Sequence, residues 1–471
     1  MATNQTGITA EHADYQRYTP IYKKIRAILE GKDAVVELKL PMPNYTDMAK
    51  GGLALDTCKI ANRNKIYLQR GQLLNATART QQANTGMIWS QEPEGLDSIP
   101  SQMEYVHKYL RDNVQKIVAD VASVGRYGVL IDSPSITSTT KGEQARGIGV
   151  TNWILYTTEQ IFFWHGDDIR LSETYEEIDG IDYKQKEQVR RLVMIDGVYH
   201  NQVWRDNALV QGMDLTPTIK GVTLDYIPFQ YFGSDNNLED ATKPPIYDMT
   251  EQNLGHFMLD CDNRDNLHAH GQGMLNLFIE DTASFLDVNP NGTNTGAKGE
   301  NQFGKDDRVE ILQIAATGAI AAEMERDQER LVMMGAQMVQ DSSGNQTLGA
   351  KKIEAGASIS TLKQISMNVS EGVTQLLRWQ AGMMGIANVD SIYYTLNTAF
   401  ITDDMTPEKL LAHMKMVQMR VLPLSTLNES ARQAGLTKLD DEALKKELND
   451  ESFSVGGTTE EEAKTIAANE E

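Results

Sequence analysis

The central segment of the chain, residues 246–384, constrains the fold more than any other part of the sequence. An amphipathic helical pattern over 246–270 gives way to a Gly- and Asn-rich insert, and a second helical pattern follows at 321–340. The polar loop 341–357 then leads to a third, longer helix from Thr361. Enzymes usually carry their chemistry on loops held by a sheet. Two well-patterned helices around an extruded tip therefore indicate a stalk rather than a catalytic pocket.

The pattern within this segment predicts each of its parts. One face of the first helix is apolar or thiol-bearing, and at about 1.5 Å per residue this helix reaches roughly 37 Å. Residues 275–288 and 308–314 are strand-like around a Gly/Asn/Lys loop. A capping-box pattern, Thr361-x-x-Gln364, predicts the start of the third helix. The apolar face of the first helix comprises Met249, Leu254, Phe257, Met258 and Cys261.

The flanking regions predict helices and strands together, and so an α+β fold. Asp196-Gly197 is the strongest hairpin signal, because a type I′ turn needs positive φ at both central residues. Hydrophobic periodicity predicts the other elements. Helices are expected from Pro20 to Gly31, over 56–89 with a break at Gly71, and over 103–124, 407–419, 424–434 and 440–448; strands are expected at 129–131, 153–156, 160–165, 189–195, 198–205, 226–232 and 391–400.

Length, charge and cysteine content bound the class of protein. The 471 residues predict about three domains or subdomains. No apolar run is long enough to span a membrane, no secretory signal begins the chain, and two distant cysteines suit a reducing cytosol. The net charge of −22 opposes a grip on nucleic acid, which needs cations. It fits either ordinary acidic solubility or an acidic surface past which DNA slides without sticking.

Catalytic motifs are missing from the sequence. It contains no P-loop, no dinucleotide-binding glycine motif, no H-E-x-x-H, no paired C-x-x-C and no G-x-S-x-G. The best metal-like set is His256, Asp260, Cys261, His268 and His270, with the first two at i, i+4 on one helix face. The neighbouring apolar residues favour packing, and we expect no metal and no other cofactor. A metal-dependent hydrolase remains the competing interpretation.

Three other charged groups have simpler interpretations. Asp132 follows a short strand after Gly125-Arg-Tyr-Gly128 and is expected to cap a tight helix-to-strand connection. Glu323, Glu325, Asp327 and Glu329 share their helix with two arginines and are expected to form a solvated face. Lys351-Lys352 is expected to be surface charge, unless its loop faces DNA.

Several phrases in a fixed order resemble the portal proteins of tailed bacteriophages, in a branch catalogued as a phage domain of unknown function. The resemblance covers about residues 15 to 450. The phrases that carry it are Tyr22-Lys-Lys-Ile-Arg-Ala-Ile-Leu-Glu-Gly31, Tyr67-Leu-Gln-Arg-Gly-Gln-Leu-Leu-Asn-Ala-Thr-Ala-Arg-Thr80, Gly125-Arg-Tyr-Gly-Val-Leu-Ile-Asp-Ser-Pro134, Asp262-Asn-Arg-Asp-Asn-Leu-His268 and Ser391-Ile-Tyr-Tyr-Thr-Leu-Asn-Thr-Ala-Phe400.

What the resemblance implies is a structural ring protein without enzymatic activity, usually twelvefold, at one vertex of the capsid in the virion. Such a ring is assembled in the host cytoplasm. Its partners would be the major capsid protein and scaffold, the terminase large subunit and then the head–tail adaptor. Double-stranded DNA would pass through its channel during packaging and ejection, without sequence specificity and without a membrane. A monomeric head–tail adaptor or scaffold-like protein remains an alternative.

The resemblance also implies a division of the chain and a set of site residues. The N-terminal wing would be 1–245, the stem helices 246–276 and 321–342, the clip 277–320, the channel loop 343–360, the long wing helix and strand 361–404, and the crown with its acidic tail 405–471. The channel-loop candidates are Asp341, Asn345, Gln346, Lys351, Lys352 and Glu354; the acidic stem face is Glu323, Glu325 and Glu329; the motor-docking candidates in the clip are Asn291, Lys298, Lys305, Asp306 and Asp307.

Overall fold

The chain divides into two compact units, Met1–Thr398 and Ala399–Glu471. The computed structural model describes residues 7–38, 40, 57–132, 151–179, 182–219, 221–270, 274–279, 281–289, 308–312, 318–335 and 348–400, together with 414–417, 419, 421, 423, 425–428 and 446. In the second unit the described residues include helical turns at 414–417 and 425–428. The rest of the three helices expected between 407 and 448 lies outside the described residues.

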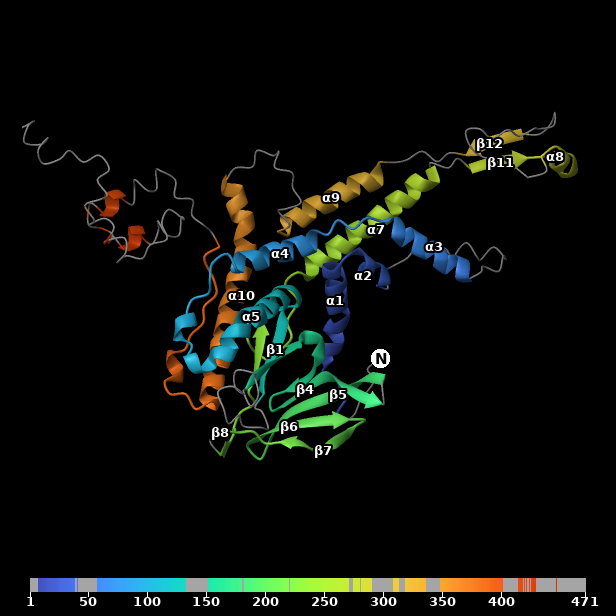
Figure 1. Ribbon diagram of the computed structural model, residues 1–471. Coiled ribbons are helices and arrows are strands. Elements are labelled where there is room, and N and C mark those ends of the chain that lie inside the picture. Colours follow the sequence, from blue (N-terminus) through green and yellow to red (C-terminus); the bar gives the residue numbers. More distant parts are fainter. Residues whose placement is uncertain are drawn as a thin grey trace, which may run out of the picture. The chain divides into compact units, whose positions relative to one another are not determined.

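The first unit is α+β with antiparallel sheets, as the sequence predicts (Figure 1). Its helices are α1 (Ala13–Glu30), α2 (Lys32–Glu37), α3 (Thr57–Arg70), α4 (Ala76–Ile88), α5 (Glu104–Val124), α7 (Tyr247–His270), α8 (Thr282–Val288), α9 (Ala319–Met333) and α10 (Leu348–Met383). Its strands are β1 (Arg126–Asp132), β2 (Asn152–Thr157), β3 (Ile161–His165), β4 (Asp168–Asp179), β5 (Asp182–Ile195), β6 (Val198–Arg205), β7 (Ala208–Leu215), β8 (Thr218–Ile219), β9 (Val222–Thr223), β10 (Phe229–Gly233), β11 (Met274–Phe278) and β12 (Arg308–Leu312). Among these helices, none combines the length and apolarity that a membrane crossing needs.

The larger β-structure is a five-stranded meander in the order β3-β4-β5-β6-β7. Asp196-Gly197 is the predicted hairpin turn between β5 and β6, with φ of 51° and 76°. Asp206-Asn207 makes a second such turn, at 48° and 63°. Strands β4 and β7 were not predicted from the sequence, because β4 carries many charges and β7 is exposed at the edge of the sheet.

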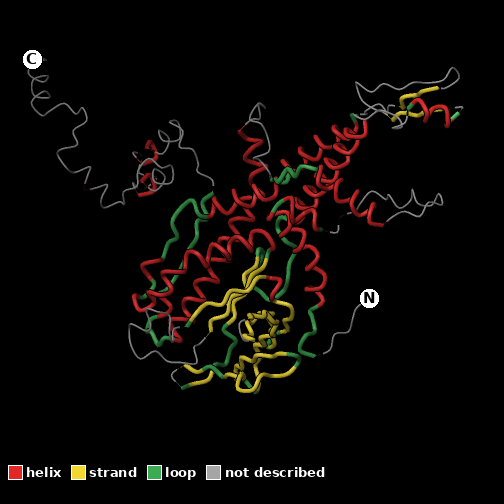
Figure 2. Tube along the Cα trace, turned by 45° about the vertical axis from the view of Figure 1, so that its right-hand side comes forward, coloured by secondary structure: helices red, strands yellow, loops and turns green. Residues whose placement is uncertain are grey.

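A second sheet, β10-β1-β2, shares one hydrophobic core with the meander. Side chains from both sheets, Leu130, Tyr156, Trp164 and Phe229 among them, meet in this core. The strands of the first unit's sheets gather beneath its helices (Figure 2). Gly128 lies where β1 passes the Phe229 ring, and a Cβ there would stand 2.3 Å from the ring. A larger residue at this point would clash with that ring and with Ile161 of β3, at 2.8 Å, so the packing of the core would have to shift.

Helices α1, α5 and α10 are anchored to this β-structure. The Arg26 guanidinium of α1 pairs with Asp120 of α5 at 2.7 Å and with Glu159 at 2.8 Å. In α10, Gly372 lies against Phe232 of β10, so closely that a Cβ would stand 2.4 Å from the ring. These contacts join helices from both ends of the first unit's sequence.

Four predicted elements differ in the structure. The N-terminal helix begins at Ala13, with Pro20 inside it, because Tyr18 and Tyr22 are buried on both sides of the proline. Residues 275–288 are not one strand, because Asp281 accepts a hydrogen bond from the Ala283 N–H and starts α8.

Residues 391–400 do not form a strand. They make one isolated bridge, Glu94 to Thr395, and hydroxyls of α10 accept hydrogen bonds from the Tyr394 and Leu396 N–H groups. Those side-chain bonds replace a strand ladder.

The loop expected at 343–360 is the fourth difference. Residues from Leu348 onward are helical and belong to α10, which runs through the capping-box pattern without a break. The run Ala350-Lys-Lys-Ile-Glu-Ala355 consists mostly of strong helix formers, and these outweigh the glycines at 349 and 356.

Candidate functional site

Helix α7 and its partners form the candidate site, because they hold the predicted stalk. One side of α7 is apolar and packs on α1 and α3. Phe257 and Cys261 are fully buried there. The buried members of this cluster are Ala27, Ile28, Val35, Tyr67, Leu68, Leu254, Phe257 and Cys261. The predicted apolar face of the helix is therefore confirmed for Leu254, Phe257, Met258 and Cys261, whose partners come from the N-terminal helices, but not for Met249.

The connection between α3 and α4 fits closely against α7. A Cβ at Gly71 would stand 2.3 Å from the Cys261 sulfur and 2.9 Å from the Phe257 ring. The next residue, Gln72, donates its backbone N–H to the Asp260 carboxylate at 2.5 Å, and Arg264 donates to the same oxygen at 2.8 Å. A glycine is needed here because the backbone comes within contact distance of the helix.

Hydrogen bonds and an ion pair accompany the packing of α7 on α3 and α4. The Asn253 side chain accepts from the Thr77 N–H at 3.1 Å and from the Thr77 hydroxyl at 3.0 Å, and it donates to the Leu74 carbonyl at 2.7 Å. The Tyr67 hydroxyl donates to Asp262 at 2.7 Å, and Arg70 pairs with Asp265. These bonds fix the register of α3 and α4 along α7.

The other side of α7 packs on α9, and here the contact is partly apolar and partly polar. Met249 shares a small buried cluster with Leu331, while His256 lies 3.3 Å from the Gln328 amide nitrogen. Positions 249 and 256 ascend along α7 as 331 and 328 descend along α9, so the two helices are antiparallel (Figure 1). The stalk therefore consists of two helices that pack against each other.

Burial and two nearby carboxylates act on the pKa of His256 in opposite directions. Burial lowers the pKa of His256 from its ordinary value, and the carboxylates of Asp327 and Asp260 oppose that shift without cancelling it. The imidazole is therefore neutral at pH 7. Asp327 is itself 4% exposed and accepts from Arg330 at 2.8 Å.

The acidic stem face is as predicted at two positions. Glu325 and Glu329 are exposed. Glu323 is held by Arg326 at 2.7 Å and by Arg330 at 3.2 Å, and the Arg326 hydrogen bond lowers the pKa of Glu323. The expectation for Asp327 was wrong: this residue points toward α7 and is buried, because it lies on the same side of α9 as Leu331.

The metal-like set is not brought together by the fold. Asp260 is engaged by Gln72 and Arg264, and Cys261 lies in the apolar cluster, where burial raises its thiol pKa to about 12. His268 is exposed and follows His256 by twelve residues, about 18 Å along a helix. The side chain of His270 lies outside the described residues. Within the described ranges, no three His, Cys, Asp or Glu side chains are arranged to hold a metal ion.

The tip between the two stalk helices consists of the antiparallel pair β11–β12 and the short helix α8. Phe285 of α8 is buried, whereas Phe278 and Leu286 are 54% and 49% exposed. The motor-docking candidates Asn291, Lys298, Lys305, Asp306 and Asp307 lie outside the described residues. The expected β tip is thus present as two strands and a helix.

The channel-loop candidates divide into two groups. Asp341, Asn345 and Gln346 lie outside the described residues. Lys351, Lys352 and Glu354 belong to the first turns of α10, so their expected place in a loop was wrong.

The expected role of Asp132 as a cap was also wrong, because Asp132 is the last residue of β1 and pairs with Asn152. Burial raises its pKa, and the Asn201 amide donates to it at 3.4 Å. Sequence reasoning missed Arg126, which is 3% exposed and stacks 3.8 Å from the centroid of the Trp164 ring. An arginine three residues before the apolar run 129–131 was the available signal.

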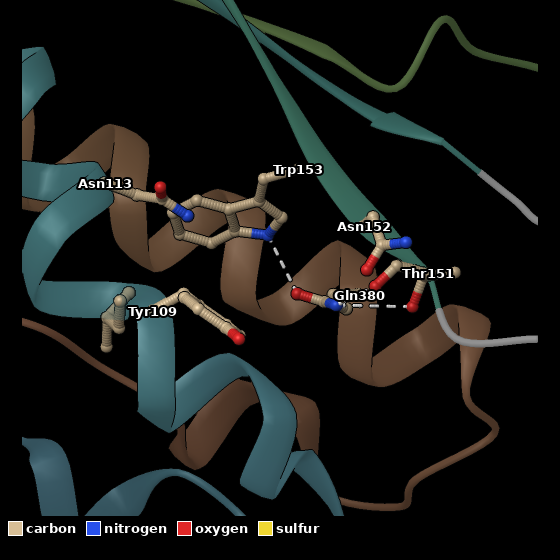
Figure 3. A pocket seen from close by; sticks show the side chains of 7 residues that line it. Tyr109, Asn113, Thr151, Asn152, Trp153 and Gln380 are labelled. Atoms are coloured by element: carbon tan, nitrogen blue, oxygen red, sulfur yellow. Dashed lines mark hydrogen bonds between the residues drawn. The ribbon is translucent and has the colours of Figure 1, made fainter. Parts of the chain in front are cut away.

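A small hollow lies between α5, β2 and α10 (Figure 3). The Gln380 amide oxygen accepts from the Trp153 indole at 2.8 Å, and its nitrogen donates to the Thr151 carbonyl at 2.6 Å. The seven residues that line the hollow include one titratable side chain, that of Tyr109. This hollow joins α10 to the sheet and offers little chemistry for catalysis.

Comparison with known proteins bears on the same segment. Among curated proteins, none matches the chain. Residues 245–384 match a family described as a domain of unknown function, DUF4055. The matched residues begin just before α7 and end one residue after α10, so they cover the stalk, its tip and the long helix as one stretch.

Proposed function

We propose that this chain is a portal protein of a tailed bacteriophage: one subunit of a ring at a single capsid vertex, through which DNA enters and leaves. In this proposal α7 and α9 are the stem, and β11, α8 and β12 are the clip. The sheets with α1–α5 and α10 form the wing, and residues after 398 form the crown. The function is conduction of DNA and docking of partners, without catalysis.

One observation carries the proposal. Two antiparallel helices pack on each other, and the chain between them forms a small tip of two strands and a helix. The long helix α10 follows and returns to the sheets, where Gly372 and Gln380 contact them. A stalk that leaves a body, carries a tip and returns suits a protein that presents a docking end.

The charge of the chain supports conduction rather than binding. Duplex DNA binds proteins by exchanging its counterions for Lys and Arg side chains. A chain with a net charge of −22 supplies few such contacts, and the exposed Glu325 and Glu329 add none. DNA would meet little attraction along such a stem.

The proposal is tested by the mass and shape of the purified chain. Native mass spectrometry and negative-stain images at moderate salt should show a closed ring of about a dozen subunits with a central hole. The measurement is repeated with the scaffold protein of the same phage, since some rings need a template. A chain that stays monomeric at high concentration in both conditions contradicts the proposal.

A further inference from the structure

Helix α7 is covered on two opposite sides, and this leaves the outer sides of its two neighbours open. Leu254 belongs to the cluster with α3, whereas His256 contacts α9. The two positions are two residues apart, about 200° around a helix with 3.6 residues per turn. Helices α3 and α9 therefore lie on opposite sides of α7, each with an outer side that faces away from it.

The outer side of α9 is acidic with an apolar end. Ala322, Glu325, Glu329 and Met333 recur at helical spacing and are exposed, Met333 by 71%. We name these four residues the α9 flank. The arginines of α9 are held by Glu323 and Asp327, whereas Glu325 and Glu329 pair with none of the described cations. Two like charges at i, i+4 repel each other unless a cation approaches them.

The outer side of α3 has the opposite charge. Lys65, Ile66 and Gln69 are exposed there, Ile66 by 40%, and we name these three residues the α3 flank. The sequence of α3 contains Lys59, Arg63, Lys65 and Arg70 and no acidic residue. Nearby, Lys32 donates to the Gln69 carbonyl at 2.8 Å, which places a further cation at this end of the helix.

We propose that the α3 flank of one copy of this chain binds the α9 flank of a second copy. Lys65 would pair with Glu325 or Glu329, and Ile66 would pack on Met333. The two surfaces differ and lie on opposite sides of α7, so the contact is head-to-tail and can repeat from copy to copy. This inference rests on the proposed ring and names the surfaces that would join its subunits.

Charge complementarity identifies the second copy as the partner. Chains that each carry −22 repel one another, so an assembly of them needs local contacts of opposite sign. The α3 flank carries the exposed Lys65 and no carboxylate, whereas the α9 flank carries Glu325 and Glu329, and each flank has an exposed apolar residue, Ile66 or Met333. Because such pairs are screened at high salt, assembly should weaken as salt rises.

The test uses two charge-reversal variants of the full chain. Lys65→Glu makes both flanks acidic, and the double substitution Glu325→Lys with Glu329→Lys makes both flanks basic. Each variant alone should need at least a tenfold higher concentration for half-assembly than the wild type. An equimolar mixture should assemble again, because each acidic flank then meets a basic one.

Two controls keep the outcome clear. Lys116→Glu, a reversal at an exposed site on α5, should assemble as the wild type does. Circular dichroism and thermal unfolding should be unchanged in every variant, since each substituted residue is exposed. Mass spectrometry of the mixture should show the two variants in equal numbers within each ring.

The failures of the two proposals are distinguishable. Wild-type rings with reversal variants that assemble equally well would overturn the flank contact and leave the proposed function standing. Variants that fail alone and also fail when mixed would likewise overturn it. A wild-type chain that stays monomeric in every condition would overturn both.

Discussion

The two sides of α7 differ in the kind of contact they make. Toward α3 and α1, Phe257 and Cys261 are fully buried among apolar side chains, and backbone groups join in. Toward α9, Met249 meets Leu331, and the polar part of the contact is made by His256 and Gln328, next to the buried Asp327. Apolar packing depends little on pH, whereas the protonation of a buried histidine changes with pH. We call the contact of α7 with α3 and α1 the firm joint. We call the contact of α7 with α9, which includes a buried histidine, the adjustable joint.

The largest expected effect comes from truncating the firm joint. Phe257→Ala removes a ring that is 0% exposed, and such changes cost about 3–5 kcal/mol of unfolding free energy. Urea unfolding followed by circular dichroism measures the loss. Leu267→Ala, on the same helix but 56% exposed, is the matched control and should change little. Equal losses from both would show that the α3 side is not the firm one.

A second substitution tests how closely the backbone approaches the same side. Gly71→Ala places a methyl group 2.3 Å from the Cys261 sulfur, and overpacking of this kind costs about 1–3 kcal/mol. Gly255→Ala on α7 meets nothing within 4 Å and should instead stabilise the helix by about 0.5–1 kcal/mol. Opposite signs in thermal unfolding would confirm the close approach, and a neutral Gly71→Ala would contradict it.

The sequence predicts the α3 side of α7 better than the α9 side, for a physical reason. Leu254, Phe257, Met258 and Cys261 recur at helical spacing, so the firm side and the helix itself were expected, as were α5 and the hairpin at Asp196-Gly197. The α9 side has no such pattern. His256 is polar and buried, and burial of a polar side chain depends on a partner distant in sequence.

The same limit explains the other misses. Asp327 reads as solvated among Glu323, Glu325 and Glu329, and only the position of α7 shows which of the four is inside. Arg126 is held by stacking on Trp164, a residue 38 positions away. In α10, the glycines at 349 and 356 argued against a helix, although the residues around them favour one. Local patterns predict elements, whereas partners of buried polar groups require the tertiary structure.

A pair of carboxylates on α9 sharpens the comparison within the adjustable joint. Asp327 and Glu323 both accept from Arg330, at 2.8 Å and 3.2 Å, but Asp327 is buried and Glu323 is not. Asp327→Asn should cost about 1–3 kcal/mol, because a buried charged hydrogen bond is lost. Glu323→Gln should leave the urea midpoint unchanged within error. A reversed order would place Asp327 outside the α7–α9 contact.

The smallest expected effect is a pH dependence at His256. Its pKa in the folded chain lies below the ordinary value, which is about 6.5 in an unfolded chain. Above that value both states are neutral at this site. As the pH falls through 6.5, this histidine takes up a proton in the unfolded chain but stays neutral in the folded chain. The free energy of unfolding therefore falls. His256→Gln removes this contribution and should lose less stability between pH 7 and pH 5.5 than the wild type.

Thermal unfolding at several pH values measures that difference, and the exposed His268 provides the control on the same helix. His268→Gln should follow the wild-type pH dependence, because its side chain is not buried against α9. If His256→Gln also follows the wild type, the α9 side is no more sensitive to pH than the α3 side. The two sides of α7 would then differ in composition but not in behaviour, and the stalk would be a single firm unit.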